Sequence, residues 1–387
     1  MDMNYFGITV LAFWSLLGCN AKDIDTSQTS LNTKSCFTDN TPMNAFELFP
    51  NQPTTQIHSD IAFDGQWIWI VFNLPNDDAD FDVFLGAIDC NGNVVVEPKQ
   101  ILAIAGLNQT TPRIAISNDH ILIAAQSDNG SSANNLSIHL HVQNRDGEQI
   151  TEREWTPTID DVEIGNRWLP SISGDEEGFW MTAAAANETH FQTALQRLNR
   201  NGENVGAPFW IGPDTYAVFP TIDGNETNFV AAWESGEESV QWITGSLDGM
   251  NEEYSEQANS SYPRVLWNDG SPNLFANRRT PLAVTMNDEQ LSLMGNSHFP
   301  NAATGTSTTL IGYFKIQSGN ANDVYISSLR DGAIDIQDSK LESTPPAAPY
   351  RPAVTNVGGD TYMLVWSGGE YPNFVLRGQF IDLTTTD

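Results

Sequence analysis

Short apolar runs recur along the chain, separated by loops rich in Gly, Asn and Asp. The clearest unit extends from Ile61 to Val96 and reads IAFDGQWIWIVF, an acidic loop, and then DVFLGAIDCNGNVVV. Its apolar runs and turn residues predict a strand, a tight turn, a buried strand, a loop, a strand, an Asn-Gly hairpin and a final strand. The unit therefore predicts one four-stranded antiparallel sheet.

Two marks show that this unit is repeated. The first is a proline that starts a short strand and precedes a small-and-apolar pair; it stands at Pro112, Pro170, Pro220, Pro263 and Pro352. The second is a hairpin with Gly, for which Asn-Gly and Asp-Gly supply the positive φ values of a type I′ turn. It occurs at Asn91-Gly92, Asp146-Gly147, Asn201-Gly202, Asp248-Gly249 and Asp331-Gly332.

Between the two marks lie strands that are apolar on both faces, as expected for strands sandwiched between neighbouring sheets. These strands are Trp67 to Phe72, Ile121 to Ala125, Phe179 to Ala184, Phe229 to Trp233 and Tyr362 to Trp366.

The spacing of the marks predicts the fold class. The prolines lie 58, 50 and 43 residues apart, and the last gap is 89 residues. Four strands in a period of about 40–50 residues are typical of a β-propeller. Counting the gap from Pro263 to Arg351 as two blades predicts seven blades, which we prefer; counting it as one predicts six. A β-sandwich is the competing architecture, but it needs no such self-similarity.

The two ends of the repeat region predict that the ring is closed. The final unit, from Pro352, contains three strands, and a fourth can come from Asn44 to Phe49. Sharing one blade between both ends removes the open edge of the ring. We therefore expect an all-β domain over residues 43–387.

The N-terminal segment predicts export. The chain from Tyr5 to Gly18 is uncharged, too short to span a bilayer and suited to a signal-peptide core. Leu16-Leu17-Gly18-Cys19 resembles the bacterial lipobox, which implies that residues 1–18 are removed and that Cys19 is acylated. The alternative is an ordinary secretory signal with an incidental cysteine. Residues 19–42 are polar and rich in Ser, Thr and Asn, which predicts a flexible tether.

The lipobox and the repeats together resemble a known group of proteins. The repeated units end in DCNG, NRDG, NRNG and LRDG. With Leu16 to Cys19, they resemble the large, mostly uncharacterised bacterial lipoproteins with propeller-like repeats that are frequent in myxobacteria. The resemblance implies a protein held at the cell envelope by a lipid anchor in the membrane. Asn20 after Cys19 implies the outer membrane, by the rule of enterobacterial lipoproteins.

Two cysteines remain after Cys19. Because an exported protein meets an oxidising compartment, Cys36 and Cys90 are predicted to form a disulfide, and two free thiols are the alternative.

The charge excludes one class of partner. The chain has 49 acidic and 17 basic residues and a net charge of −32. Such a surface repels phosphate backbones, so no nucleic-acid partner is expected. We interpret the charge mainly as an adaptation for solubility.

Candidate chemistry is sparse. The sequence lacks GxSxG, HExxH and a phosphate-binding Gly loop. Asp78, Asp80 and Asp82 lie at a spacing of two, which resembles a calcium loop, although Val83 and Asp89 stand where an EF-hand needs Gly and Glu. A solvated acidic loop is the preferred interpretation, and calcium is the one cofactor that this loop suggests.

Two further patterns resemble known sites. His139 and His141 are predicted to point to one face of a strand, but no third metal ligand is identifiable. Ser173 to Trp180 resembles the Asp-box of sialidase-type propellers with one residue too many, and we interpret it as a turn.

Three functions fit these observations. The first is a lipid-anchored envelope propeller that binds a protein or glycan ligand at its axial face or serves as a scaffold. The second is a glycan-active hydrolase or lyase with paired carboxylates as acid and base. The third is a purely structural envelope protein.

Overall fold

The computed structural model describes residues 36, 41, 43–76, 80–128, 136–186, 191–212, 217–236, 238–247, 249–250, 254–268, 270–292, 295–316, 322–341, 351–370 and 372–384. The predicted signal peptide lies outside these residues, as do Cys19 and almost all of the predicted tether. Every regular element in the described part is a β-strand. No helix long and apolar enough to cross a membrane is found there.

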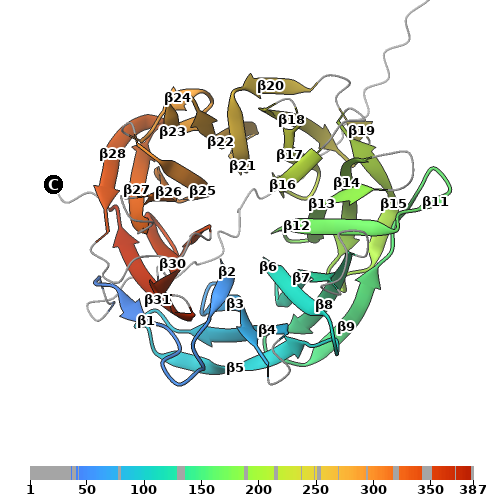
Figure 1. Ribbon diagram of the computed structural model, residues 1–387, viewed down its shortest axis with the longest axis horizontal. Coiled ribbons are helices and arrows are strands. Elements are labelled where there is room, and N and C mark those ends of the chain that lie inside the picture. Colours follow the sequence, from blue (N-terminus) through green and yellow to red (C-terminus); the bar gives the residue numbers. More distant parts are fainter. Residues whose placement is uncertain are drawn as a thin grey trace, which may run out of the picture. The chain divides into compact units, whose positions relative to one another are not determined.

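Seven antiparallel sheets stand in a ring, so the protein is a seven-bladed β-propeller, as the preferred count predicted (Figure 1). In the first six blades the strand that comes first in the chain lies nearest the axis. Blade 1 consists of β2 (Ile57–Phe63), β3 (Ile68–Pro75), β4 (Phe81–Ile88) and β5 (Val94–Leu102). Blade 2 consists of β6 (Asn108–Ser117), β7 (His120–Asp128), β8 (Ser137–Asn144) and β9 (Gln149–Trp155).

The next three blades follow the same order. Blade 3 consists of β12 (Asn166–Gly174), β13 (Gly178–Ala186), β14 (Phe191–Asn199) and β15 (Asn204–Ile211). Blade 4 consists of β16 (Ala217–Gly224), β17 (Asn228–Ser235), β18 (Ser239–Ser246), and β19 (Gly249–Met250) and β20 (Ser255–Ala258), which both pair with β18. Blade 5 consists of β21 (Ser260–Asn268), β22 (Ser271–Arg279), β23 (Leu282–Met286) and β24 (Glu289–Gln290).

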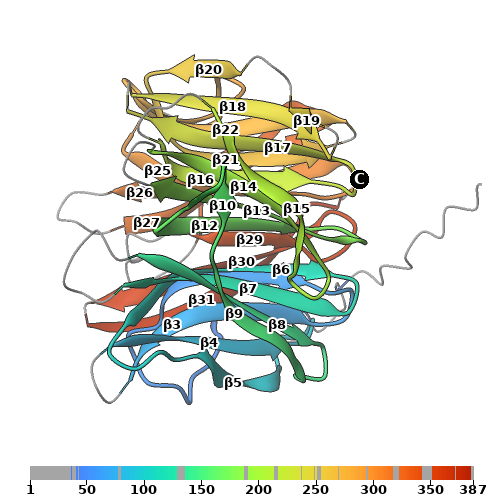
Figure 2. The ribbon, with the colours of Figure 1, turned by 90° about the vertical axis from the view of Figure 1, so that its right-hand side faces the viewer.

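Blade 6 consists of β25 (Ser297–Thr304), β26 (Thr308–Ile316), β27 (Asn322–Arg330) and β28 (Ala333–Lys340). Blade 7 consists, from the axis outward, of β29 (Ala353–Asn356), β30 (Thr361–Glu370), β31 (Asn373–Asp382) and β1 (Phe46–Glu47). A short ribbon of β10 (Thr158–Ile159) and β11 (Val162–Glu163) lies between blades 2 and 3 in the chain. Figure 2 shows the ring edge-on.

The ring is closed by the N-terminal strand, as predicted. In β1, Phe46 and Glu47 pair with Gly378 and Arg377 of β31. The backbone N–H of Leu48 extends this contact by donating to Leu376 O at 3.0 Å. Because β1 covers the outer edge of blade 7, this edge is not left unpaired.

The core consists of one apolar cluster at each of the seven interfaces between blades. The second strands supply the largest share of it, and in β3 and β13 every residue but the last is buried. This is the pattern that their continuous apolar sequences predicted. Four of the largest buried side chains are tryptophans of these strands: Trp69, Trp180, Trp233 and Trp366.

The wide gap in the proline pattern contains two blades. The missing mark is Pro300, in the sequence HFPNAA, which begins the inner strand of blade 6 in the same way as the other prolines. Blade 5 is the degenerate one, because β23 has five residues and β24 has two.

The hairpins lie where they were predicted, but their turn type was wrong in three of them. Gly92, Gly147 and Gly202 have φ values of 79°, 81° and 76°, whereas the residue before each glycine has no positive φ. Each loop has three residues, closed by a bond from the glycine N–H to the carbonyl of Asp89, Asn144 or Asn199. Only Asp331-Gly332 has two successive positive φ values, and Asp248 lies outside the described residues.

Candidate functional site

The site is identified by one residue near the start of each inner strand, which precedes the repeated proline in β6 to β25 and precedes Ser59 in β2. In each of the six inner strands from β2 to β25, the register with the second strand shifts at this point, which marks a β-bulge. The bulged residue has a φ of 46° to 57° in every case: His58, Thr111, Leu169, Phe219, Tyr262 and Phe299. Bulges re-aim side chains at the rims of closed sheets. Here they present one side chain per blade to the same axial cavity.

Three cavities follow one another along the axis. The first, of about 170 Å³, is lined by the bulged residues at the start of the inner strands, and we call it the N-terminal mouth. The second, of about 70 Å³, is lined by residues one to three positions further along, and we call it the central cavity. The third, of about 370 Å³, is lined by the ends of the inner strands, and we call it the C-terminal mouth. Adjacent cavities share lining residues, so together they form an axial channel.

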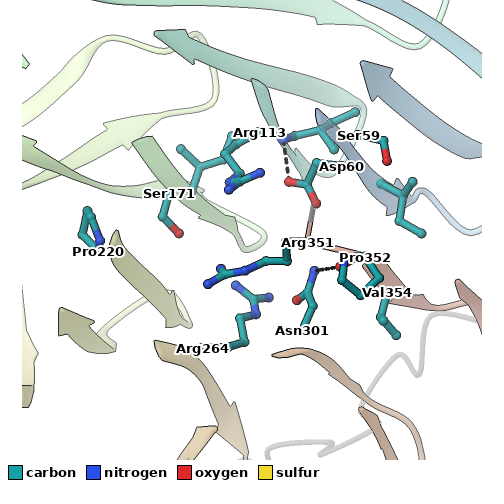
Figure 3. A pocket seen from close by; sticks show the side chains of 13 residues that line it. Ser59, Asp60, Arg113, Ser171, Pro220, Arg264, Asn301, Arg351, Pro352 and Val354 are labelled. Atoms are coloured by element: carbon teal, nitrogen blue, oxygen red, sulfur yellow. Dashed lines mark hydrogen bonds between the residues drawn. The ribbon is translucent and has the colours of Figure 1, made fainter. Parts of the chain in front are cut away.

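Three arginines converge in the central cavity. Arg113 comes from blade 2, Arg264 from blade 5 and Arg351 from the residue before the proline of blade 7. Figure 3 shows their guanidinium groups turned toward one another, with Asp60 beside Arg113. Asp60 is the single carboxylate among the described residues that line this cavity, so the lining carries more positive than negative charge.

Other blades use the same position to join their neighbours. Asp60 accepts the backbone N–H of Ile114 at 3.2 Å, and Ser171 accepts that of Ile222 at 3.3 Å. Asn301 donates to Pro352 O at 3.0 Å. These short polar side chains connect one blade to the next.

The three arginines form few hydrogen bonds with the described protein for the number of donors that they carry. Arg113 donates to Pro112 O at 3.3 Å, and Arg351 reaches across the channel to Pro263 O at 3.2 Å. The buried Nε of Arg264 has no hydrogen-bond partner within the described part of the chain. No ion pair joins any of these arginines to a described carboxylate. Several of their N–H donors therefore have no acceptor in the described part of the chain, and the three guanidinium groups line the cavity.

The electrostatics of the channel reflect this crowding of like charges. Burial, followed by the neighbouring charges of Arg113 and Arg264, lowers the pKa of Arg351 to about 9. Burial also lowers the pKa of Arg113, although Asp60 acts in the opposite direction. Burial and the charge of Arg113 lower the pKa of His58 to about 4. At neutral pH Arg351 is charged and His58 is neutral. An anion in the cavity would relieve the repulsion between the guanidinium groups.

The N-terminal mouth is apolar and partly aromatic. The ring of Tyr262 lies 4.7 Å from that of Phe219 and 4.4 Å from that of Phe299, measured between centroids. Leu169 and Pro170 continue this lining, and all three rings remain partly exposed. We call Leu169, Phe219, Tyr262 and Phe299 the apolar collar.

A partly buried carboxylate supports the backbone of the collar. Glu234 accepts the backbone N–H of Tyr262 at 3.2 Å and is paired with Arg279. Burial raises the pKa of Glu234, and the bonds from Tyr262 and Arg279 oppose this shift. The Arg279 contact holds Glu234 in place, which in turn fixes the bulged backbone at Tyr262.

The C-terminal mouth contains the other carboxylate of the described channel lining, Asp223. Asp223 accepts bonds from Ser173 Oγ at 2.5 Å and from the backbone N–H of Trp267 at 2.8 Å. Because these residues belong to blades 3 and 5, Asp223 of blade 4 joins three blades.

The structure brings Cys36 and Cys90 together as a disulfide with their Cα atoms 5.0 Å apart. Asp78 of the acidic loop lies outside the described residues. Asp80 accepts the N–H of Gly106 at 3.2 Å, and Asp82, which is 1% exposed, accepts bonds from Asn76 and Gln100. Both carboxylates thus hold parts of blade 1 and its outgoing loop together.

No group of three or more His, Cys, Asp or Glu suited to a metal ion occurs among the described residues. His139 and His141 lie on β8 and bond to Ser137 and Gln143, at 3.1 and 3.3 Å. Burial lowers the pKa of both imidazoles.

Sequence reasoning missed the three arginines. The signal was present in TPRIAI and YPRVL, where Arg113 and Arg264 directly follow the repeated proline, and in RPAVT, where Arg351 directly precedes it. The spacing of the prolines gives the number of blades, but it does not show that the variable residues beside them form one layer of a ring.

No protein-family model matches the sequence, and no curated protein matches it. Solved structures share the fold. A protein of unknown function from Dyadobacter fermentans is 10% identical, with a TM-score of 0.53, over 89% of this chain and 99% of that chain. Trypanosoma rangeli sialidase is 8% identical, with a TM-score of 0.53, over 87% of this chain and 57% of that chain. The endosialidase of phage phi92 is 9% identical, with a TM-score of 0.52, over 89% and 70%. At these identities the similarity concerns the fold alone.

Proposed function

We propose that the protein is a binding module of the cell envelope whose axial channel takes an anionic ligand. The observation that carries this proposal is the convergence of Arg113, Arg264 and Arg351 on a cavity that contains one carboxylate, Asp60. Buried charges are normally paired. Like charges gathered in one place favour a ligand of opposite sign.

The ligand class follows from the donors. A guanidinium presents several N–H groups in a planar fork that matches a carboxylate or a phosphate. The central cavity is about 70 Å³, which suits one such group rather than an extended polyanion. We therefore expect a small carboxylate or the carboxylate of a larger molecule, such as an acidic sugar. Trypanosoma rangeli sialidase, which shares the fold, has been solved in complex with sialic acid, an acidic sugar of this kind.

The positive charge of the cavity contrasts with the negative charge of the whole chain. In a chain with 49 acidic and 17 basic residues, three of the basic residues occupy one small cavity. The net charge of −32 repels anions from the surface at large, so binding inside the channel must come from local donors.

The cellular location remains part of the proposal. The lipobox-like sequence Leu16 to Cys19 supports acylation of Cys19 and anchoring at the bacterial envelope, with the outer membrane as the expected site. Mass spectrometry of the mature N-terminus tests this. A diacylated or triacylated Cys19 supports the anchor, and an unmodified terminus at another residue contradicts it.

A glycan hydrolase is the second candidate, because sialidases share the fold. Its chemistry needs two carboxylates that are able to act on a sugar. The two carboxylates of the described channel lining, Asp60 and Asp223, accept backbone N–H groups of neighbouring blades and thereby join these blades. Their structural engagement favours binding over hydrolysis. Release of the leaving group from a fluorogenic sialoside, abolished by Asp60→Asn or Asp223→Asn, would favour the hydrolase instead.

The binding proposal is tested by titrating acetate into the protein at low ionic strength and following heat or ligand NMR signals. Arg264→Gln and Arg351→Gln each remove a charge from the cavity, and we expect each to weaken binding by about tenfold or more, as loss of a hydrogen bond to a charged group does. Arg200→Gln removes the same charge from an exposed surface pair and should leave binding unchanged. Equal affinity in Arg264→Gln and the wild type, or an equal loss in Arg200→Gln, would overturn the proposal.

A further inference from the structure

We propose that the anion bound by this channel carries an apolar, preferably aromatic, group that lies in the apolar collar of the N-terminal mouth. This inference rests on the proposed function, because the anion must first be held by the arginines. It adds the second half of the ligand and the direction from which the ligand enters.

The two cavities meet at shared residues. Arg113 and Arg351 line both the central cavity and the N-terminal mouth. A carboxylate held by these guanidinium groups therefore has its remaining atoms next to the collar. A ligand with a charged head and an apolar body fits both halves in one orientation, with the head toward the centre of the ring.

The collar has room for a ring. Its cavity measures about 170 Å³. A protein cavity of about 150 Å³ lined by aliphatic and aromatic side chains takes benzene. The ring of Tyr262 meets that of Phe219 edge-on and that of Phe299 at a tilt, and each of the three residues keeps part of its surface exposed. Three adjacent blades therefore offer aromatic surface on one side of the mouth.

The backbone conformation of the collar residues supports a functional role. A bulky residue with positive φ is strained, and strain of this kind gathers at functional sites. His58 and Thr111, on the opposite blades, have the same bulge and the same positive φ. The backbone conformation is therefore common to the repeats, whereas the aromatic side chains are not. Blades 4, 5 and 6 place Phe219, Tyr262 and Phe299 where blade 2 has Thr111. The repeat thus fixes the positions, and the aromatic choice makes one side of the mouth apolar.

The opposite mouth provides a matched control. Phe63, at the end of β2, lines the C-terminal mouth and is also partly buried. Replacing Phe63 or Phe299 by Ala removes the same side chain from opposite ends of one channel. Only the second change should affect a ligand whose apolar part lies in the collar.

The test compares acetate with phenylacetate by titration calorimetry on the purified protein. Each buried CH₂-sized group contributes on the order of fourfold in affinity, so phenylacetate should bind at least about tenfold more tightly than acetate. This ratio should fall toward one in Phe299→Ala and stay at its wild-type value in Phe63→Ala. Phe299→Leu, which keeps an apolar side chain, replaces Phe299→Ala if circular dichroism shows that the alanine variant is misfolded, and should lower the ratio partially.

The possible results separate the two proposals. If both acids bind the wild type equally, the collar inference is overturned while anion binding stands. If the ratio falls in Phe63→Ala and not in Phe299→Ala, the apolar group lies at the other mouth and the inference is likewise overturned. If neither acid binds the wild type, the proposed function fails and this inference fails with it.

Discussion

The sulfur atoms of Cys36 and Cys90 are bonded, and the backbone N–H of Cys36 donates to Val357 O at 2.9 Å. Cys90 lies in the β4–β5 hairpin of blade 1, and Val357 follows β29 in blade 7. Cys36 also belongs to the apolar cluster between these two blades. The disulfide therefore fastens the seam between the first and the last blade, in addition to the pairing of β1 with β31.

Removal of this bond should weaken the whole ring. The cysteines are 54 residues apart, and closing a loop of this length lowers the entropy of the unfolded chain by an amount worth about 4 kcal/mol. We expect Cys36→Ser, Cys90→Ser or reduction to lower the free energy of unfolding by about 2–4 kcal/mol. Denaturant unfolding with and without reductant measures this change.

The variant that lacks both cysteines is the control, because reductant should have no effect on it. Coincident unfolding curves of the oxidised and reduced wild type would show that the seam does not depend on the disulfide.

The repeats allowed most of the fold to be predicted, because the blades bury their second strands on both faces, and blades 1, 2, 3 and 6 close their outer hairpins with glycine. The turn type was harder. Asp89, Asn144 and Asn199 each accept a backbone N–H four residues ahead through the side-chain oxygen, which favours a three-residue loop. Leu329 has no such oxygen, and LRDG forms a two-residue turn in which Arg330 pairs with Ala333. The residue that decides the turn type thus stands ahead of the Asn-Gly or Asp-Gly pair.

The candidate site was harder still. A ring of seven blades places residues from 60 to 351 side by side, and the spacing of the prolines identifies these residues only after the register of each bulge is known. Asp60, Arg113 and Arg264 occupy one layer because all three follow the bulge by the same number of residues. The residues that line a channel can be predicted only by comparing equivalent positions in different blades. The periodicity within one blade does not supply this comparison.

Close approach of neighbouring blades should make Gly174 intolerant of any side chain. A Cβ atom at Gly174 in β12 would lie 2.2 Å from Ile116 O and 2.8 Å from Ile116 C in β6. Backbone atoms of a neighbouring strand cannot rotate away, so we expect Gly174→Ala to lower the free energy of unfolding by about 1–3 kcal/mol. Thermal and denaturant unfolding measure the loss.

Gly165 provides the matched control, since it is exposed and a Cβ atom there would meet no atom within 4 Å. Gly165→Ala should change stability by no more than about 0.5 kcal/mol. Equal effects of the two substitutions would mean that the blades can separate at Gly174 without cost.

The buried ion pair of Arg197 with Asp175 should contribute far more than the exposed pair beside it. Arg197 Nη1 and Nη2 bond to the two Asp175 oxygens at 2.7 and 2.8 Å, and its guanidinium lies 5.0 Å from the centroid of Trp180. Both side chains are less than a tenth exposed. Arg197→Met leaves the Asp175 carboxylate buried without its charge partner, and we expect a loss of about 3–5 kcal/mol in the free energy of unfolding.

Arg200→Met is the comparison, because Arg200 pairs with Glu177 at 3.2 Å on the surface. Exposed pairs contribute about 0–1 kcal/mol, so this variant should unfold almost as the wild type does. If Arg197→Met were as stable as Arg200→Met, the turn that carries Asp175 would not depend on the buried pair.

Acid should destabilise the ring through His58. Its folded-state pKa, about 4, lies below the ordinary value of 6.5 because of burial and the charge of Arg113. Between these values the unfolded chain binds a proton that the folded chain does not, so stability is lost as the pH falls from 6.5 toward 4. The shift corresponds to a loss of about 3 kcal/mol from this group.

Asn tolerates the left-handed backbone conformation of this residue, so His58→Asn removes the titration while keeping the bulge. Because the other acid-sensitive groups are common to both proteins, denaturant unfolding at pH 7 and pH 4 should show the wild type losing about 3 kcal/mol more than His58→Asn. Equal losses in the two proteins would mean that His58 is protonated at the same pH in the folded and unfolded chains, and hence that the mouth beside Arg113 is open to water.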